Sequence, residues 1–180
     1  MSVRASLVAA LVLGSSLTMA PAPVALAASA ADAVVPEVST VPVGAEPDGT
    51  PVRLDVSVWP QSSGKHAVVL LAHGFGGTKD SVASQANELH ERGYVVIAWS
   101  ARGHGRSGGR IHLNDPAYEI ADARTLLDLA ATRADVELDG PGDPRAGVMG
   151  ASYGGALGLM LAGADRRAAP TGRSSSPRPA

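Results

Sequence analysis

The chain contains no cysteine among its 180 residues, so neither a disulfide framework nor a thiolate zinc site can support its fold. Aromatic residues make up only 3% of the sequence, and no long basic run accompanies the net charge of -2. A surface for nucleic acid needs clustered basic charge, so we expect no nucleic-acid partner. Hydrophobic residues make up 45% of the chain, which is enough for one modest domain held by its apolar core.

The chain has five histidines, the last of which is His112, so its last third contains none. The histidines His66, His90, His104 and His112 fall on different predicted elements without the close spacing of metal ligands. We therefore expect no metal site and no cofactor.

The two ends of the chain differ in composition from its middle. Residues 1–30 carry Arg4, an apolar stretch and A-x-A cleavage patterns, which predicts a secretory signal peptide and a secreted protein. A membrane anchor is the alternative, but the apolar stretch of about 13 residues falls short of the roughly 20 that a span needs. We expect residues 31–51 to form an extended leader, and residues 166–180, rich in Arg, Pro and Ser, a disordered tail.

The middle of the chain, residues 52–165, alternates between strand and helix patterns. Arg53–Trp59 alternates polar and apolar residues like a half-buried strand, and Val68–Ala72 and Tyr94–Trp99 are continuous apolar runs typical of buried strands. The spacing of apolar residues predicts helices over Lys79–Arg92, Glu119–Thr132 and Tyr153–Ala164, and Asp139–Pro144 is expected to be a connecting turn. This order predicts an α/β fold with a mostly parallel sheet and crossover helices.

The sequence AGVMGASYGG, which starts at Ala146, predicts a short buried strand, a G-x-S-x-G turn and the start of a helix. That order is typical of the nucleophile elbow of serine hydrolases, which makes Ser152 the candidate nucleophile. Side chains at Gly150 and Gly154 would collide where the strand and the helix approach each other. A tight glycine turn without chemistry is the alternative interpretation.

Two backbone amides are candidates for an oxyanion hole next to Ser152. A helix that begins at Tyr153 directs its N-terminal amides and positive dipole end toward the forming oxyanion, so we expect the Tyr153 amide to be one donor. The loop that follows the strand Val68–Ala72 has the shape to supply the second, from the Phe75 amide. We expect His73, which opens this loop, to order it rather than to act as the catalytic base.

A glycine-rich loop after Trp99 contains two competing motifs. Ser107 lies in a second G-x-S-x-G, but no helix follows it directly, so we expect a loop serine. Residues 103–108 also match the dinucleotide fingerprint G-x-G-x-x-G, and Asp122 follows it at about the sequence spacing of a ribose-binding acid. However, these glycines do not lie at the start of a helix, as they would in a true fingerprint. The arginines of this loop could favour an acidic substrate, although a solvated charged loop is the simpler explanation.

Four separated motifs occur in the order found in a known family: HGFGGTKDS, YVVIAWSARGHGRSGG, the helix from Tyr118 to Leu129, and LDGPGDPRAGVMGASYGG. Together they resemble the α/β-hydrolase domain of X-prolyl dipeptidyl-peptidases and cocaine-esterase-like serine hydrolases, over about residues 52–165. The resemblance implies the N-terminal part of an α/β-hydrolase fold, with Ser152 acylated and the Tyr153 and Phe75 amides as its oxyanion hole. It further implies a small peptide or ester substrate.

The sequence departs from that family after the elbow helix, where the catalytic acid and histidine should follow the serine. Neither can be assigned, and Asp165 lies at the wrong end of the elbow helix. We expect a truncated or frame-shifted hydrolase with little turnover, an open and apolar sheet edge and a marginal fold. A secreted binding module without catalysis and an inert truncated product are the alternatives.

Overall fold

The computed structural model describes residues 34–165. The predicted signal peptide at 1–30 and the predicted tail at 166–180 lie outside the described residues. Among the helices that are described, none combines the length and apolar composition that crossing a membrane requires.

The central element is a five-stranded sheet in the order β1-β2-β4-β3-β7. Strands β4, β3 and β7 are parallel to one another, while β1 and β2 join them by antiparallel pairing. The predicted α/β fold with crossover helices is confirmed, with an antiparallel addition at one edge. The strands of this sheet are β1 (Glu37–Val43), β2 (Val52–Trp59), β3 (Val68–Ala72), β4 (Val95–Trp99) and β7 (Ala146–Gly150).

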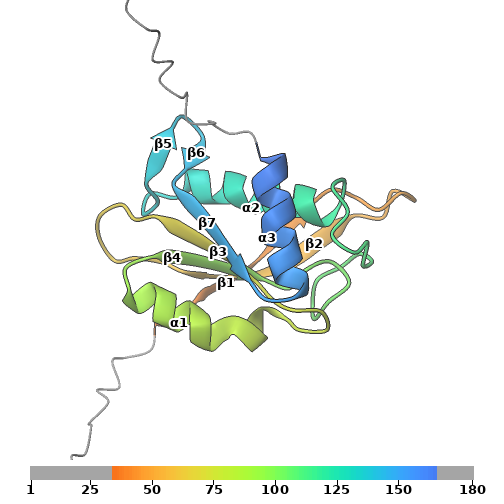
Figure 1. The fold of residues 1–180 in the computed structure, drawn as a ribbon, viewed down its shortest axis with the longest axis horizontal. Coiled ribbons are helices and arrows are strands. Elements are labelled where there is room, and N and C mark those ends of the chain that lie inside the picture. Colours follow the sequence, from red (N-terminus) through yellow and green to blue (C-terminus); the bar gives the residue numbers. More distant parts are fainter. Residues whose placement is uncertain (1–33, 166–180) are drawn as a thin grey trace, which may run out of the picture. The chain divides into compact units, whose positions relative to one another are not determined.

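Helices cover both faces of this sheet (Figure 1). Helix α1 (Ala83–Glu91) lies on one face, and α2 (Glu119–Thr132) and α3 (Tyr153–Ala164) lie together on the other. Each face has its own apolar cluster, because the side chains of β2, β3 and β4 point alternately to the two sides. The larger cluster includes Leu70, Ile97, Leu126 and Leu157, and the smaller one packs Ala86 of α1 against the sheet.

Two predicted segments have more structure than the sequence suggested. Residues 37–43, which we assigned to an extended leader, form β1 and pair with β2 along its length. Their composition hides the strand because β1 is an edge strand with mostly exposed side chains, so no buried face imposes a period on it. Likewise, the predicted turn at 139–144 contains a small hairpin of β5 (Leu138–Gly140) and β6 (Asp143–Pro144).

The predicted helix over residues 79–92 is divided in two. A short 3-10 helix, η1 (Lys79–Val82), precedes α1. The Thr78 side chain caps η1 in a reciprocal capping box with Ser81. Gly93 follows the helix with a φ of 90°, a conformation that glycine adopts without strain.

Strand β2 is more buried than its alternating sequence predicted. Asp55 and Ser57 were expected on a solvent face, but both are buried. The loop after β4 covers this face, and Ser107 ties it down by accepting from the Asp55 N–H at 2.8 Å and donating to the Ser100 carbonyl at 2.6 Å. The Ser107 hydroxyl therefore both donates and accepts a hydrogen bond that holds the loop in place. This agrees with the prediction that Ser107 is a loop serine.

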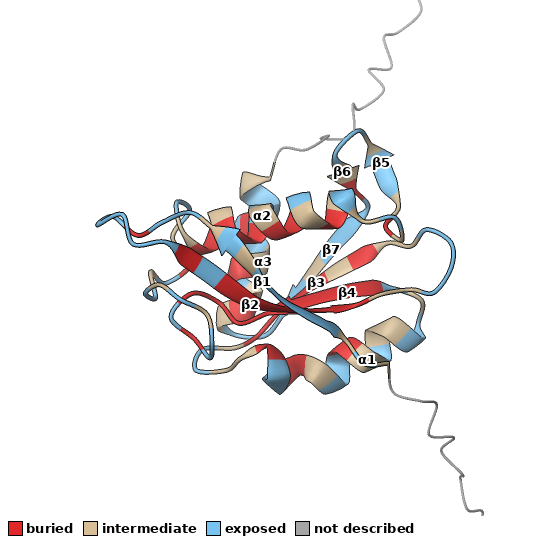
Figure 2. Ribbon diagram, turned by 180° about the vertical axis from the view of Figure 1, so that it is seen from behind, coloured by how far each residue is buried: buried red, intermediate tan, exposed pale blue. Residues whose placement is uncertain are grey.

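Strand β7 was predicted to be buried, which is wrong, whereas the open and apolar sheet edge that we also expected is present among the described residues. β7 lies at the sheet edge with only β3 beside it, and Figure 2 shows most of it as exposed. Met149 is 46% exposed, and Leu159 on the outer side of α3 is 80% exposed. The apolar composition of β7 and α3 suggested burial on all sides, yet the described residues provide neighbours on one side only.

A buried arginine organises the loop after β4. The Arg102 guanidinium is almost completely buried and holds Asp122 of α2 with two hydrogen bonds of 2.6 and 2.7 Å. It also reaches Glu46 at 3.3 Å, so one cation joins the β1–β2 connection, the loop and α2. Glu46 binds further groups of the same loop, accepting from the Arg110 N–H and pairing with the His112 ring.

The strands and helix that surround Ser152 approach each other at two glycines. A Cβ atom on Gly154 would overlap the Ala72 carbonyl oxygen and lie 2.8 Å from that of His73. On Gly150 it would lie 2.6 Å from the Gly154 carbonyl carbon. Atoms as large as carbon cannot pack this closely, so β3, β7 and α3 adopt these positions only with glycine at both sites.

We predict that Gly154→Ala lowers the free energy of unfolding by about 2 kcal/mol or more, because the new methyl group forces the α3 backbone away from β3. Urea titration followed by circular dichroism measures this change. Gly163→Ala, in the same helix but with no atom within 4 Å of the added methyl group, is the matched control. It should raise stability by up to about 1 kcal/mol. Equal effects of both substitutions would contradict the packing argument.

Arg102→Met should cost about 3–5 kcal/mol in the free energy of unfolding, because it leaves the carboxylates of Asp122 and Glu46 buried without their cation. The control is Arg106→Met in the same loop, whose side chain is 72% exposed although it pairs with Asp55. We expect it to cost about 1 kcal/mol or less. Chemical denaturation measures the free energy of unfolding of both variants. A decrease below about 1 kcal/mol for Arg102→Met would refute the organising role of this side chain.

Candidate active site

Ser152 occupies the turn that joins β7 to α3 and has an unusual backbone conformation. Its φ and ψ angles are 53° and -115°, a combination that costs free energy for any residue with a side chain. Ser152 is exposed, whereas Gly154 two residues later is buried against β3. The strand-turn-helix arrangement predicted from the sequence is therefore present, with Ser152 at its sharpest point.

Parallel pairing of β3 with β7 brings the loop His73–Gly77 beside this turn. Ala72 pairs with Gly150, so the two strands end at the same level and their following segments meet. The Phe75 and Tyr153 rings are 5.7 Å apart and nearly perpendicular. The residues predicted to supply the two oxyanion donors are thus neighbours on either side of the turn.

The amides of Phe75 and Tyr153 have no hydrogen-bond acceptor within residues 34–165, whereas nearby amides do. The Gly77 N–H donates to Gly74, and the Gly154 N–H donates to Ala151. Free N–H groups at the N-terminus of a helix and in an adjacent loop are suited to binding an oxyanion.

His73 is buried, and both of its ring nitrogens are engaged. Nε2 accepts a hydrogen bond from the Ala101 N–H at 2.9 Å, so Nδ1 carries the proton and donates to the Gly74 carbonyl at 2.7 Å. Burial lowers the pKa of His73, although its hydrogen bond to Gly74 opposes the shift. The imidazole is therefore neutral at pH 7 and has no free nitrogen for a serine proton, consistent with the loop-ordering role that we expected.

His104 lies behind the turn, where its ring centroid is 5.6 Å from that of Phe75 and 5.8 Å from that of Tyr153. Its Nδ1 contacts the Arg102 carbonyl oxygen at 3.2 Å. Its Nε2 is buried and has no hydrogen-bond partner in the part of the chain that the structure describes. Sequence reasoning considered His104 only as a metal ligand, because nothing in the sequence indicates that the loop after β4 folds back beneath the elbow.

Two further residues hold Tyr153 and were missed from the sequence. Asn114 donates to the Tyr153 carbonyl oxygen at 3.0 Å, and the Tyr153 hydroxyl donates to Glu119 at 3.3 Å. Burial together with the Glu119 charge raises the pKa of Tyr153 to about 12, so the phenol remains a donor at neutral pH. Tyr153 was singled out only for its amide, since the sequence gives no signal for contacts between residues so far apart along the chain.

A catalytic acid and base are not found next to Ser152 among residues 34–165. No hydrogen bond to its Oγ is present there, and no group of three or more histidine or acidic side chains could hold a metal ion. Asp165 follows the far end of α3, as expected. Asp122, the ribose ligand of the alternative dinucleotide site, is already bound to Arg102.

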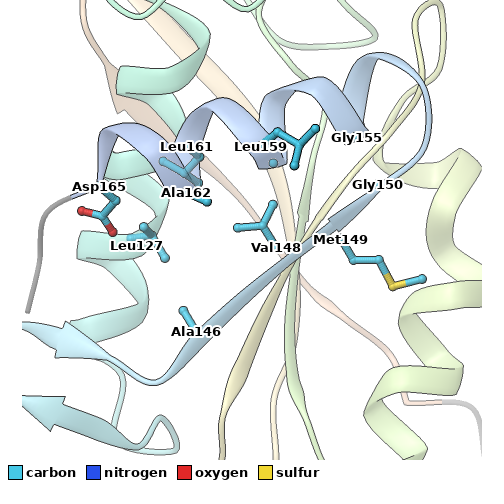
Figure 3. Close-up of a pocket in the computed structure, with 11 residues that line it drawn as sticks. Leu127, Ala146, Val148, Met149, Gly150, Gly155, Leu159, Leu161, Ala162 and Asp165 are labelled. Atoms are coloured by element: carbon cyan, nitrogen blue, oxygen red, sulfur yellow. The ribbon is translucent and has the colours of Figure 1, made fainter. Parts of the chain in front are cut away.

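A hollow among the described residues lies away from Ser152. About 510 Å³ in volume, it runs along the open side of β7 and α3, where Val148, Leu159, Leu161 and Asp165 line it (Figure 3). Neither Ser152 nor Phe75 lines it, so we do not regard it as the place where an acyl group binds.

Comparison with known proteins agrees with this fold. Residues 63–172 match the model of the family described as serine aminopeptidase, S33. The chain is also 38% identical over 107 residues to a monoacylglycerol lipase of Mycolicibacterium smegmatis, covering 59% of this chain and 36% of the lipase.

Solved structures give the same fold. Epoxide hydrolase A from Mycobacterium thermoresistibile superimposes with a TM-score of 0.53 at 27% identity, over 71% of this chain and 35% of that one. DcsB in complex with a substrate analogue has a TM-score of 0.58 at 20% identity, over 73% of this chain and 42% of that one.

The chain spans about a third of the length of the curated relatives that it matches. These findings support the α/β-hydrolase part of the resemblance seen in the sequence, while its X-prolyl dipeptidyl-peptidase part stays a prediction. Because the family model covers more than half of the chain, this protein belongs to the serine aminopeptidase S33 family of α/β-hydrolases.

Proposed function

We propose that this hydrolase acts by acyl transfer from a small ester, with Ser152 as the nucleophile. The observation that carries the proposal is the conformation of Ser152, an exposed serine with a φ of 53° between β7 and the N-terminus of α3. Strain of this kind persists where the surrounding structure enforces it, and it clusters at functional sites. Here the glycines at 150 and 154 enforce it, since β3 leaves no room for any other residue there.

The proposed chemistry proceeds in two steps. The Ser152 Oγ attacks the carbonyl carbon and its proton passes to a base, which returns the proton to the leaving oxygen as the C–O bond breaks, so that an alcohol departs and the acyl-enzyme forms. Water then attacks the acyl-enzyme and releases the acid, which restores the serine. In both steps the negative charge on the carbonyl oxygen would be bound by the amides of Tyr153 and Phe75 and by the positive end of α3.

We expect slow turnover from this chain alone. A serine hydroxyl is a weak nucleophile without an adjacent base. Within residues 34–165 no side chain accepts a hydrogen bond from Ser152, and both nitrogens of His73 are engaged. The same observation favours the second candidate function, a binding module that keeps the hydrolase scaffold without catalysis.

The substrate class follows from two different resemblances. Similarity to a monoacylglycerol lipase supports a monoacyl ester, with an alcohol as the leaving group. The motifs of the sequence resemble X-prolyl dipeptidyl-peptidases, which would instead make the substrate a peptide with proline in second position. We favour the ester, because the lipase is 38% identical over 107 residues.

We further propose that the protein is exported. The support is the sequence of residues 1–30, with Arg4, an apolar stretch and A-x-A patterns, which resembles a secretory signal. N-terminal sequencing of protein recovered from the culture medium of the producing cells would locate the cleavage.

A fluorophosphonate should label this protein slowly at Ser152, because the proposed oxyanion hole would bind the reagent although no base contacts the serine among residues 34–165. Mass mapping of the adduct identifies the residue, and Ser152→Ala should abolish the reaction. Ser107→Ala is the matched control, since Ser107 lies in the same G-x-S-x-G spacing but uses its hydroxyl to pack the loop. It should leave labelling intact. A folded protein that takes up no reagent would favour the binding module.

A panel of chromogenic substrates separates the two substrate classes. We expect hydrolysis of short monoacyl esters at a rate at least about tenfold above that of Ser152→Ala, and no release from an Ala-Pro anilide. Cleavage of the anilide in preference to the esters would instead favour the X-prolyl peptidase specificity.

A further inference from the structure

Tyr153 is held at both its main chain and its side chain by one distant segment. The Asn114 Nδ2 donates to the Tyr153 carbonyl oxygen at 3.0 Å, and the Asn114 N–H donates to the Tyr153 hydroxyl at 3.3 Å. That hydroxyl in turn donates to the Glu119 carboxylate at 3.3 Å. A side chain fixed at its far end and a carbonyl fixed near the Cα leave the residue little freedom to rotate.

Glu119 anchors this arrangement from the first turn of α2. It is almost completely buried, with an exposed fraction of 1%. Besides the Tyr153 hydroxyl, its carboxylate accepts from the His112 N–H at 2.6 Å and the Asp115 N–H at 3.1 Å. One carboxylate thus fixes the loop at 112–115 and Tyr153 relative to the same helix.

The loop adopts this position at a cost in stability. Leu113 and Asn114 have φ values of 57° and 63°, in the left-handed region that favours glycine. The Asn114 Oδ1 is also buried without a hydrogen-bond partner among the described residues. Turning the amide over would satisfy nothing, because it would place this oxygen against the Tyr153 carbonyl oxygen. Backbone strain beside an unsatisfied acceptor needs an explanation beyond packing.

We propose that Asn114 and Glu119 are positioning residues, which hold Tyr153 so that its main-chain N–H is directed at the carbonyl oxygen of an acyl group bound at Ser152. This inference rests on the proposed acyl transfer. The N–H lies in the peptide plane between Ser152 and Tyr153, whose Ser152 carbonyl oxygen already accepts from the Ala156 N–H at 2.9 Å. The contacts of Asn114 and Glu119 fix the other end of this plane, at the Tyr153 Cα, so releasing them lets the donor tilt. A displaced donor weakens binding of the oxyanion more than binding of the neutral carbonyl.

Tyr153→Phe tests the proposal, because it removes the phenol while keeping the ring between Phe75 and His104. We expect the limiting rate constant for fluorophosphonate labelling to fall about tenfold, with the half-saturating reagent concentration unchanged. The matched control is Tyr118→Phe, at the nearby tyrosine whose ring stacks on that of His112. It should label within about twofold of the parent protein. Asn114→Asp, which replaces the amide donor by a carboxylate, should slow labelling as Tyr153→Phe does.

Hydrogen exchange of the peptide covering residues 150–156 gives a readout that needs no nucleophilic serine. We expect exchange there to rise about tenfold or more in Tyr153→Phe and to remain unchanged in Tyr118→Phe. Faster exchange with an unaltered labelling rate would make the clamp purely structural, and unaltered exchange would overturn the clamp itself. Failure of the parent protein to label would refute the proposed acyl transfer and the positioning role with it, whereas the clamp would still be judged by exchange.

Discussion

The structure depends on the close approach of the α3 N-terminus to the end of β3. This approach is possible because glycine occupies positions 150 and 154, where any side chain would meet the backbone of Ala72. The turn between them has no room to relax, and Ser152 is driven to a positive φ. This packing constraint places the exposed Ser152 at the positive end of the α3 dipole. The amides of Phe75 and Tyr153, which have no acceptor within residues 34–165, lie beside it.

A second constraint, made of charges, holds the surroundings of this turn. Arg102 joins the β1–β2 connection to α2 through Glu46 and Asp122, and Glu119 joins the same helix to the loop at 112–115. These groups are buried, so each must be paired, and their pairing defines where the long loop after β4 can lie. The glycine contacts therefore shape the turn, while the charged network determines which residues surround it.

The sequence predicted what depends on local pattern and missed what depends on distant contacts. The motif around Ser152, the three main helices and the buried strands β3 and β4 could be predicted from spacing and apolar runs. Edge strand β1 could not, because no buried face imposes a period on its side chains. Composition alone wrongly predicted the burial of β7, because composition reports how apolar a segment is and not which neighbours it has, whereas the open sheet edge was expected. The roles of Asn114 and Glu119 could not be predicted, because their contacts with Tyr153 join residues that are more than 30 positions apart in the sequence.

The strand order has a consequence for how the protein folds. β3 pairs with β4 early in the sequence and with β7 only near the end of the described residues, and the turn at Ser152 exists only once that last pairing has formed. Pairings between distant segments are slow, because the entropy of closing a long loop is lost before the contacts are gained. The strained turn at Ser152 therefore requires the pairing with the longest sequence separation in the described sheet, so a reactive Ser152 would report that this pairing has formed.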